Sequence, residues 1–194
     1  MFSEASHQRF AMEYKTDRLI LRVLTPDYAT DVCTFLSKNS EHFEKYEPYL
    51  PANYYTPDHQ HTILSCELKL ALQTKNIRYY VFIKENPEQI IGTVCLHNIT
   101  AASYSSCEIG YKFDSDYWHK GYAREAVSMV IAVAFAALNL HRVYARVMPE
   151  NTASIRLLKA LLFVEEGMER ECIKIRGKWE DHLRFSLIDQ SSKM

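Results

Sequence analysis

The sequence predicts a domain of the α/β or α+β class that is built on a mixed sheet. In the middle of the chain, short β-type runs are separated by turn residues, which is the pattern of an antiparallel meander. After the meander the pattern changes, because a β-type run now alternates with helical segments. The two patterns together favour a mixed sheet over an all-β or an all-α fold.

The first predicted elements are a strand and a helix. Residues 18–24 form the β-type run RLILRVL, and Pro26 opens a helical pattern over residues 26–38. Residues 39–60 hold several aromatic side chains but are interrupted by three prolines, which predicts an aromatic loop or a broken helix. A helical pattern follows over residues 62–73.

The later elements rest on the same two periodicities. Strands are short runs bounded by turn residues, and helices place apolar side chains three or four positions apart. The predicted strands are 79–84, 90–98, 106–113 and 141–148, with a turn at 86–88; the predicted helices are 123–138 and 152–162; and a hairpin joins 164–175 to 179–188 around Arg176, Gly177 and Lys178.

The length of 194 residues and the mass of 22.7 kDa favour a single domain. The simplest organisation is an N-terminal extension (1–14), one domain (15–189) and a C-terminal tail (190–194), because no clear period precedes Tyr14. Hydrophobic residues make up 47% and charged residues 24% of the chain, and this composition excludes a disordered or fibrous protein.

Charge and hydropathy exclude several classes of partner. The 23 basic and 24 acidic residues give a net charge of −1, so we expect neither a nucleic acid nor a membrane as partner. The longest apolar run, 126–138, has 13 residues, too few to span a bilayer. Residues 1–14 carry charges where a secretory signal needs an apolar segment, which predicts a cytoplasmic protein.

The cysteines and histidines predict no metal site. The five cysteines are an odd number without a CxxC spacing, which favours reduced thiols. The eight histidines are scattered, and the pair of His59 and His61 is too small to indicate structural zinc.

One glycine lies where an anion could bind. Gly121 stands between a predicted strand and the long predicted helix, with Lys120 and Arg124 beside it. Backbone N–H groups at a helix start, together with the helix dipole, favour a phosphate or pyrophosphate. The alternative is an ordinary solvated helix start. The spacing of a Walker loop and the three glycines of a Rossmann motif are both missing.

Five segments carry further motifs, in this order: TDRLILRVLTPDYATDV (16–32), NSEHFEKYEPYLP (39–51), IIGTVCLHNI (90–99), EIGYKFDSDYWHKGYAREAV (108–127) and MPENTASIRLLKALLFVEEG (148–167). Together they resemble the GCN5-related N-acetyltransferases, and within that superfamily the RimJ/RimL-like ribosomal-protein N-terminal acetyltransferases. The resemblance covers most of the chain.

The resemblance implies a mostly antiparallel central sheet flanked by helices, with a splay between the family's fourth and fifth strands. Acetyl-CoA would bind there as co-substrate, with its pantetheine along residues 107–113 and its pyrophosphate on the backbone N–H groups of residues 119–124. The residues that this assigns to acetyl-CoA binding are Gly110, Tyr111, Phe113, His119, Lys120, Gly121, Tyr122, Ala123, Arg124, Asn151 and Ser154.

The chain departs from the family pattern at two positions. His119 stands where these proteins often have glycine, and its side chain could narrow the phosphate loop or change the charge of that loop. Leu162 stands where a Leu-Gly-Phe motif would have glycine, so a favoured helix-terminating residue is missing.

Glu108 is the first candidate for the general base. An α-amine is largely ammonium at neutral pH and must lose a proton before it can attack a thioester. Strand alternation points Glu108 to the same side as Gly110 and Lys112. The alternative is a surface carboxylate paired with Lys112.

Ser154 is the candidate that protonates or stabilises the departing thiolate, together with Asn151. The competing interpretation makes Asn151 an N-cap and Ser154 a residue of the first helical turn. Tyr111, Tyr117 and Tyr144 are further candidates for the proton donor. Cys107 could suggest an acyl-cysteine intermediate, but no neighbouring histidine activates it, so core packing is favoured.

These features predict an acetyl-CoA-dependent enzyme that acetylates a primary amine, preferably a protein N-terminus such as that of a ribosomal protein, as a monomer or homodimer. The aromatic and acidic residues 41–49 would form a substrate wall, or else a lid on the core. Two alternatives stay open: an enzyme that acetylates an amino sugar or a polyamine, and a non-catalytic module that binds acyl-CoA.

Overall fold

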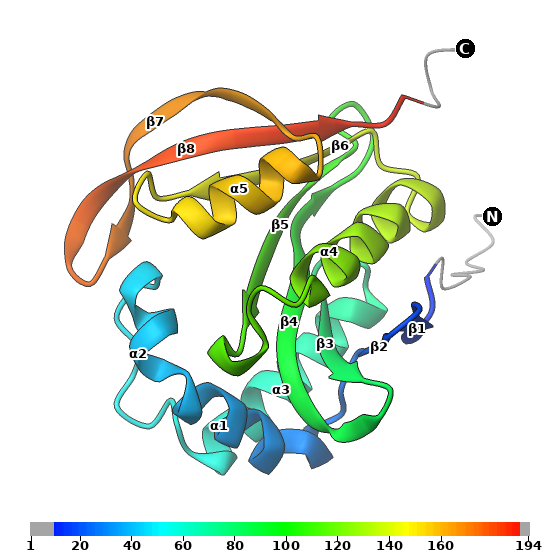
Figure 1. Ribbon diagram of the computed structural model, residues 1–194, viewed down its shortest axis with the longest axis vertical. Helices are drawn as coiled ribbons and strands as arrows, with labels where there is room; N and C mark the ends of the chain where they lie inside the picture. Colours follow the sequence, from blue (N-terminus) through cyan, green and yellow to red (C-terminus); the bar gives the residue numbers. More distant parts are fainter. Residues whose placement is uncertain (1–9, 191–194) are drawn as a thin grey trace, which may run out of the picture.

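The fold is known from a computed structural model that describes residues 10–190, and its centre is an eight-stranded sheet (Figure 1). The strand order is β1-β2-β3-β4-β5-β6-β8-β7. Neighbouring strands are antiparallel except β5 and β6, which are parallel. This confirms the predicted mixed, mostly antiparallel sheet.

The elements follow one another as strand, helices, meander and βαβ unit, with a closing hairpin. Their bounds are β1 Glu13–Lys15, β2 Leu19–Arg22, η1 Pro26–Tyr28, α1 Ala29–Lys38, α2 Ser40–Phe43, η2 Glu44–Tyr46, α3 Pro57–Leu72, β3 Ile77–Ile83, β4 Asn86–Thr100, β5 Ser106–Phe113, η3 Ser115–Tyr117, α4 Tyr122–Ala132, η4 Val133–Ala137, β6 Arg142–Val147, α5 Thr152–Ala160, β7 Val164–Ile175 and β8 Lys178–Ile188.

Helices cover both faces of the sheet, and strand alternation decides what each face buries. Leu19 and Val81 join the buried cluster that contains the α4 side chains. Tyr80 and Phe82 join the second cluster, with side chains of α1 and α3. In Figure 1, α4 and α5 lie on the near side of the sheet. No helix among residues 10–190 is both long and apolar enough to cross a membrane.

Two predicted boundaries are wrong. The helix predicted from residue 62 begins at Pro57, because proline needs no N–H partner in the first turn and Thr56 caps that turn by accepting from the His59 N–H at 3.3 Å. The turn predicted at 86–88 lies at residues 84–85 instead, since Asn86 already pairs with Ile83 across the hairpin.

Two further features differ from the sequence patterns. The long helix ends as α4 at Ala132 and continues as the π-helical turn η4. The short strand β1, which no pattern predicted, pairs with β2, so the domain boundary proposed near Tyr14 falls inside a strand. Residues 1–9 of the proposed extension and residues 191–194 of the proposed tail lie outside the described residues.

The sheet opens between β5 and β6. These strands pair only from Ser106 with Arg142 to Glu108 with Tyr144. Beyond that point β6 continues its pairing with β8, and β5 continues its pairing with β4. The second halves of two central strands therefore separate, and this is the splay that the resemblance implied.

The β7–β8 hairpin reaches across to the helices on the other side of the splay (Figure 1). Arg176 Nη1 at the hairpin tip lies 3.5 Å from Glu44 Oε2. A Cβ on Gly177 would lie 2.9 Å from the ring of Tyr49, so glycine permits this close approach. The hairpin tip thereby meets the aromatic and acidic segment that follows α2.

The chain ends α5 with a Schellman motif in which leucine takes the glycine position. Phe163 N donates to the Leu158 carbonyl and Leu162 N to the Lys159 carbonyl, at 3.0 and 3.1 Å. Leu162 has φ +65° and is 77% exposed, so the left-handed conformation that glycine favours is retained without glycine.

Leu162→Gly is expected to raise the free energy of unfolding. A left-handed conformation costs a non-glycine residue about 1–2 kcal/mol, and glycine adds back about 0.5–1 kcal/mol of backbone entropy. The net gain should be about 0.5–1 kcal/mol, measured by urea unfolding. Leu161→Gly is the control, because Leu161 has φ −95° and gains nothing from glycine. A destabilised Leu162→Gly variant would show that no strain is held at this position.

Candidate active site

The loop before α4 has a backbone that glycine makes possible. Gly121 is the N-cap of α4 and has φ +81°, and His119 has φ +60°. His119 therefore adopts, at an exposed position, the left-handed conformation that glycine favours. The first N–H groups of α4 extend from this loop, which is the arrangement that binds anions.

Arg18, in the turn between β1 and β2, supports this loop. Its Nη1 donates to the Lys120 carbonyl at 2.9 Å, and its guanidinium lies over the Tyr122 ring at 4.6 Å. The same guanidinium forms an ion pair of 2.7 Å with Glu125 in the first turn of α4. Sequence reasoning missed Arg18, because its partners lie more than 100 residues away along the chain.

The residues predicted to bind acetyl-CoA in the loop and at the end of β5 differ in their exposure to solvent. Lys120 and Arg124 are exposed, and Lys120 Nζ donates to the Asp116 carbonyl at 2.9 Å. Ala123 is half-buried against the core, and Phe113 is buried at the end of β5. The Phe113 side chain therefore packs in the core, which leaves only its backbone for the predicted contact with acetyl-CoA.

Tyr111 and Ser154 meet at the splay. The Tyr111 Oη lies 2.8 Å from the Ser154 Oγ, which joins β5 to the first turn of α5. Asn151 caps that helix, because its Oδ1 accepts from the Ser154 N–H at 3.1 Å. Burial raises the pKa of Tyr111, so its hydroxyl keeps its proton at neutral pH.

The other two tyrosines that the sequence offered as proton donors have different surroundings. Tyr117 donates its hydroxyl to Gln89 Oε1 at 3.1 Å, at the start of β4. The guanidinium of Arg184 lies 4.7 Å from the centre of the Tyr144 ring. Of these three tyrosines, Tyr111 is the one whose hydroxyl contacts Ser154 among the described residues.

Glu108 is buried, and the pairing with Lys112 that was the alternative to a catalytic role is wrong. The Glu108 side chain is 8% exposed, and its Oε2 accepts from Asn98 Nδ2 at 3.1 Å and lies 3.5 Å from Arg146 Nη2. Lys112 pairs instead with Glu47, which follows η2. Burial lowers the pKa of Lys112, and the Glu47 carboxylate opposes this shift.

A polar cavity of about 240 Å³ lies on the Glu108 side of β5. Sequence reasoning missed His97, which stands directly across from Glu108 in the β4–β5 register, with Nδ1 3.9 Å from Glu108 Oε2. These two residues are brought together only by the register of β4 against β5, which local sequence patterns do not reveal. The residues that line the cavity are Glu47, Arg78, Cys95, His97, Gly110, Tyr111 and Lys112.

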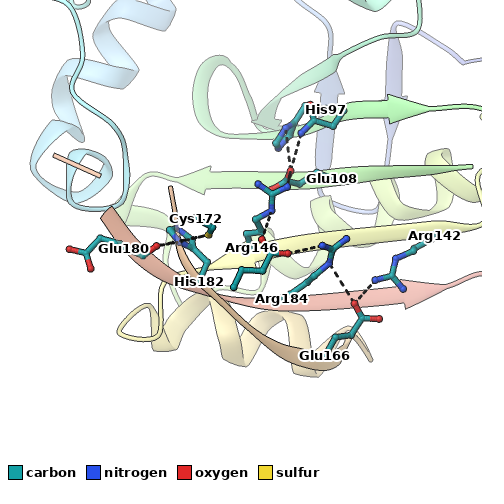
Figure 2. A network of polar contacts seen from close by, with 11 residues as sticks. His97, Glu108, Arg142, Arg146, Glu166, Cys172, Glu180, His182 and Arg184 are labelled. Carbon is teal, nitrogen blue, oxygen red and sulfur yellow. Dashed lines mark hydrogen bonds and ion pairs between the residues drawn. The ribbon is translucent and has the colours of Figure 1, made fainter. Parts of the chain in front are cut away.

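Beyond Glu108, alternating charges continue onto β6, β7 and β8 (Figure 2). Arg146 connects Glu108 to this network, and Figure 2 shows its guanidinium directed at the Glu108 carboxylate. A carboxylate faced by a fixed cation is held in position. The ion pairs that follow join Arg146 to Glu169, Glu169 to Arg184, Arg184 to Glu166 and Glu166 to Arg142.

Cys107 has the properties of a core residue. It is fully buried, and burial raises the pKa of its thiol to about 12. A thiol of that pKa is protonated at neutral pH and is a weak nucleophile. Within the described part of the chain, no group of three or more His, Cys, Asp or Glu side chains could hold a metal ion.

Comparisons with known proteins agree with this geometry. Residues 18–164 match the sequence family described as the acetyltransferase (GNAT) domain. The chain is 35% identical over 173 residues to an uncharacterized N-acetyltransferase, p20, from Bacillus licheniformis, which covers 89% of this chain and 94% of that protein.

Two solved structures extend the comparison. A ribosomal-protein-S5-alanine acetyltransferase from Vibrio fischeri superposes with a TM-score of 0.87 at 31% identity, covering 93% of this chain and 98% of that one. RimJ from Mycobacterium smegmatis, in complex with a CoA-disulfide, has a TM-score of 0.84 at 24% identity, covering 91% of this chain and 84% of that one, which is a likeness of fold.

Proposed function

We propose that this chain, which belongs to the GNAT acetyltransferase family and is an acetyl-CoA-dependent N-acetyltransferase, acetylates a protein N-terminal α-amine, most favourably one of alanine or serine. The observation that carries the proposal is the splay between β5 and β6, with the Tyr111–Ser154 pair at one side and the polar cavity at the other. The similar enzyme from Vibrio fischeri, by its description, acetylates a ribosomal protein at alanine.

The donor half of the site would lie on the α4 and α5 side of the sheet. The pyrophosphate would lie on the N–H groups between His119 and Arg124, and the pantetheine would follow β5 beside Gly110 and Tyr111. The open edge of β5 past Glu108 supports this placement, because that part of the strand has no β6 partner. Ser154 would then face the sulfur from the first turn of α5.

The acceptor half would lie in the cavity. Its volume of about 240 Å³ suits a small N-terminal side chain better than a large one. The Glu47 carboxylate on the cavity wall is paired with Lys112, and Arg78 also lines the cavity, so the charge of the wall alone does not select a cation. The hairpin tip that meets Tyr49 would close the far end of this half and guide an extended peptide toward β5.

The reaction would be a direct attack in a ternary complex. The neutral amine attacks the thioester carbon, the C–S bond breaks, and the sulfur takes a proton from the hydroxyl pair of Ser154 and Tyr111. The buried, protonated thiol of Cys107 argues against a covalent acyl-enzyme at that residue.

Gly121→Val is expected to raise the dissociation constant of acetyl-CoA at least tenfold, about 1.4 kcal/mol. Valine disfavours φ +81°, so the loop backbone must change and its N–H groups must leave the positions proposed for the pyrophosphate; its Cβ would also crowd Arg18 Nη2 at 3.3 Å. Calorimetry measures the change. Gly167→Val is the matched control, because Gly167 also has positive φ but lies on β7 with open space around it. Equal acetyl-CoA affinities for the two folded variants would show that the loop around Gly121 does not bind the pyrophosphate.

A thiol-release assay with a panel of amines tests the proposed function. Acetyl-CoA is mixed with peptides that start with alanine or serine, with polyamines and with aminoglycosides, and free CoA thiol is followed. The proposal expects the fastest release with the peptides. Faster release with a polyamine or an aminoglycoside would identify a small-molecule acetyltransferase, and no release with any amine would favour a binding module.

A further inference from the structure

His97 lies between the acceptor cavity and the Glu108 carboxylate. The two residues are cross-strand partners on β4 and β5, so they project from the same face of the sheet. Figure 2 shows the His97 ring directed at Glu108, and its Nδ1 lies 3.9 Å from Glu108 Oε2. The other ring nitrogen, Nε2, would lie 3.5 Å from a Cβ on Gly110, so it faces the space that glycine leaves open in the cavity.

Glu108 is poorly placed to meet the amine itself. Its side chain is 8% exposed, and among the described residues it is not one of those that line the cavity. Its Oε2 is already engaged by Asn98 and faces Arg146. A general base must come within hydrogen-bond reach of the proton that it takes. His97 meets this requirement in the cavity, whereas Glu108 lies behind it.

Charge and burial keep His97 neutral at pH 7. Burial lowers the pKa of His97, the Glu108 carboxylate opposes this shift, and the guanidinium groups of Arg78 and Arg146 add to it. The charged and titratable groups that face His97 or share its cavity are Glu47 after η2, Arg78 on β3, Cys95 on β4, Glu108, Tyr111 and Lys112 on β5, and Arg146 on β6. A neutral imidazole can accept a proton, which an imidazolium cannot.

We propose that His97 Nε2 is the proton acceptor of the acetyl transfer and that Glu108 acts through it as a positioning residue. The ammonium form of the acceptor gives one proton to His97 and becomes the free amine. That amine forms the C–N bond as the C–S bond breaks, and its second departing proton replaces the one that the Ser154–Tyr111 pair gives to the sulfur. Glu108 faces Nδ1 at 3.9 Å, and its negative charge stabilises the imidazolium until the ring releases its proton to solvent. This inference rests on the proposed use of the cavity as the acceptor site.

The first test needs no acceptor. The His97 ring is titrated by NMR in the wild-type protein and in Glu108→Gln, with His97→Gln used to assign the signal. We expect a pKa below the ordinary value of about 6.5, and a still lower pKa in Glu108→Gln, because the stabilising carboxylate is gone. An ordinary pKa that Glu108→Gln leaves unchanged would overturn the coupling.

The second test measures turnover with whichever amine of the panel the enzyme acetylates. His97→Ala should lower kcat about 10²-fold, and added imidazole should restore part of it, because the freed space admits the missing base. Glu108→Gln should not be rescued by imidazole. His61→Ala, at an exposed position of α3, is the control and should keep its activity. If His97→Ala does not fold, His97→Gln replaces it in the rate measurement.

The outcomes separate this inference from the proposed function. A wild-type preference for a polyamine would end the peptide proposal but leave the role of His97 to be measured with that polyamine. Near-normal kcat in folded His97 variants, together with a large loss in Glu108→Gln, would assign the proton to Glu108 directly and overturn the inference. Loss of kcat in His97→Ala without rescue, and with an unchanged pH profile, would reduce His97 to a structural role.

Discussion

Ser154→Ala is expected to lower kcat about 10²-fold, the usual contribution of a general acid, with little change in acetyl-CoA affinity. The Ser154 Oγ lies 2.8 Å from the Tyr111 Oη, so the two hydroxyls form one donor pair at the splay. Alanine removes the hydroxyl that is proposed to face the sulfur. Single-turnover kinetics at saturating acetyl-CoA measure the chemical step, and calorimetry measures the affinity.

The helix cap provides the control for this prediction. The cap uses the backbone N–H of Ser154, which alanine retains, so Ser154→Ala should keep the stability of α5. Asn151→Ala removes the cap and should cost about 1 kcal/mol of stability. Tyr111→Phe should reduce kcat in the same direction as Ser154→Ala. A loss confined to thermal stability in Ser154→Ala, with normal turnover, would leave Ser154 a helix-start residue only.

Glu108→Gln is expected to reduce kcat about 10²-fold at pH 7 while sparing acetyl-CoA binding. Glutamine keeps the shape, and its amide oxygen can still accept from Asn98, but it cannot stabilise a protonated base. The sign of the pH dependence follows from the acceptor. Its α-amine has a pKa of about 7.7–8.0, so free amine becomes abundant as the pH rises and the need for an enzymic base falls. The ratio of mutant to wild-type kcat should climb between about pH 7 and 9.

The comparison of pH–rate profiles decides between roles for Glu108. Convergence at high pH is expected whether Glu108 takes the proton or acts through His97, because both roles serve deprotonation. A ratio that does not depend on pH, or that follows the stability of the variant, would mean that Glu108 is structural. His97 without help from Glu108, another carboxylate or a chain of waters would then have to provide the base.

Sequence patterns predicted most of the helices and strands, because the periodicity of apolar residues and the positions of turn residues depend on neighbours along the chain. The β5 bounds of Ser106 and Phe113 were predicted without error, since the run alternates cleanly and turn residues bound it. Pro57 made the predicted start of α3 wrong. A proline breaks the interior of a helix but is favourable in its first turn, and Pro57 occupies that first turn. A three-residue strand such as β1 is too short to show a period at all.

The site depended on contacts that no local pattern contains. Lys112 and Glu47 are 65 positions apart, so the sequence suggested the nearer but wrong partner, Glu108. His97 meets Glu108 only through the β4–β5 register, and a shift of one residue would place it on the opposite face. At Leu162, the family's glycine could be replaced because the Schellman hydrogen bonds hold the backbone.

The position of the transferred acetyl group tests the central claim most directly. A peptide that begins with alanine and carries one internal lysine is incubated with enzyme and acetyl-CoA, beside the same peptide with a blocked N-terminus. Tandem mass spectrometry then locates the label. The account predicts one acetyl group on the α-amine of the free peptide and none on the blocked peptide. Equal labelling of the lysine in both peptides, or no labelling of either, would contradict it.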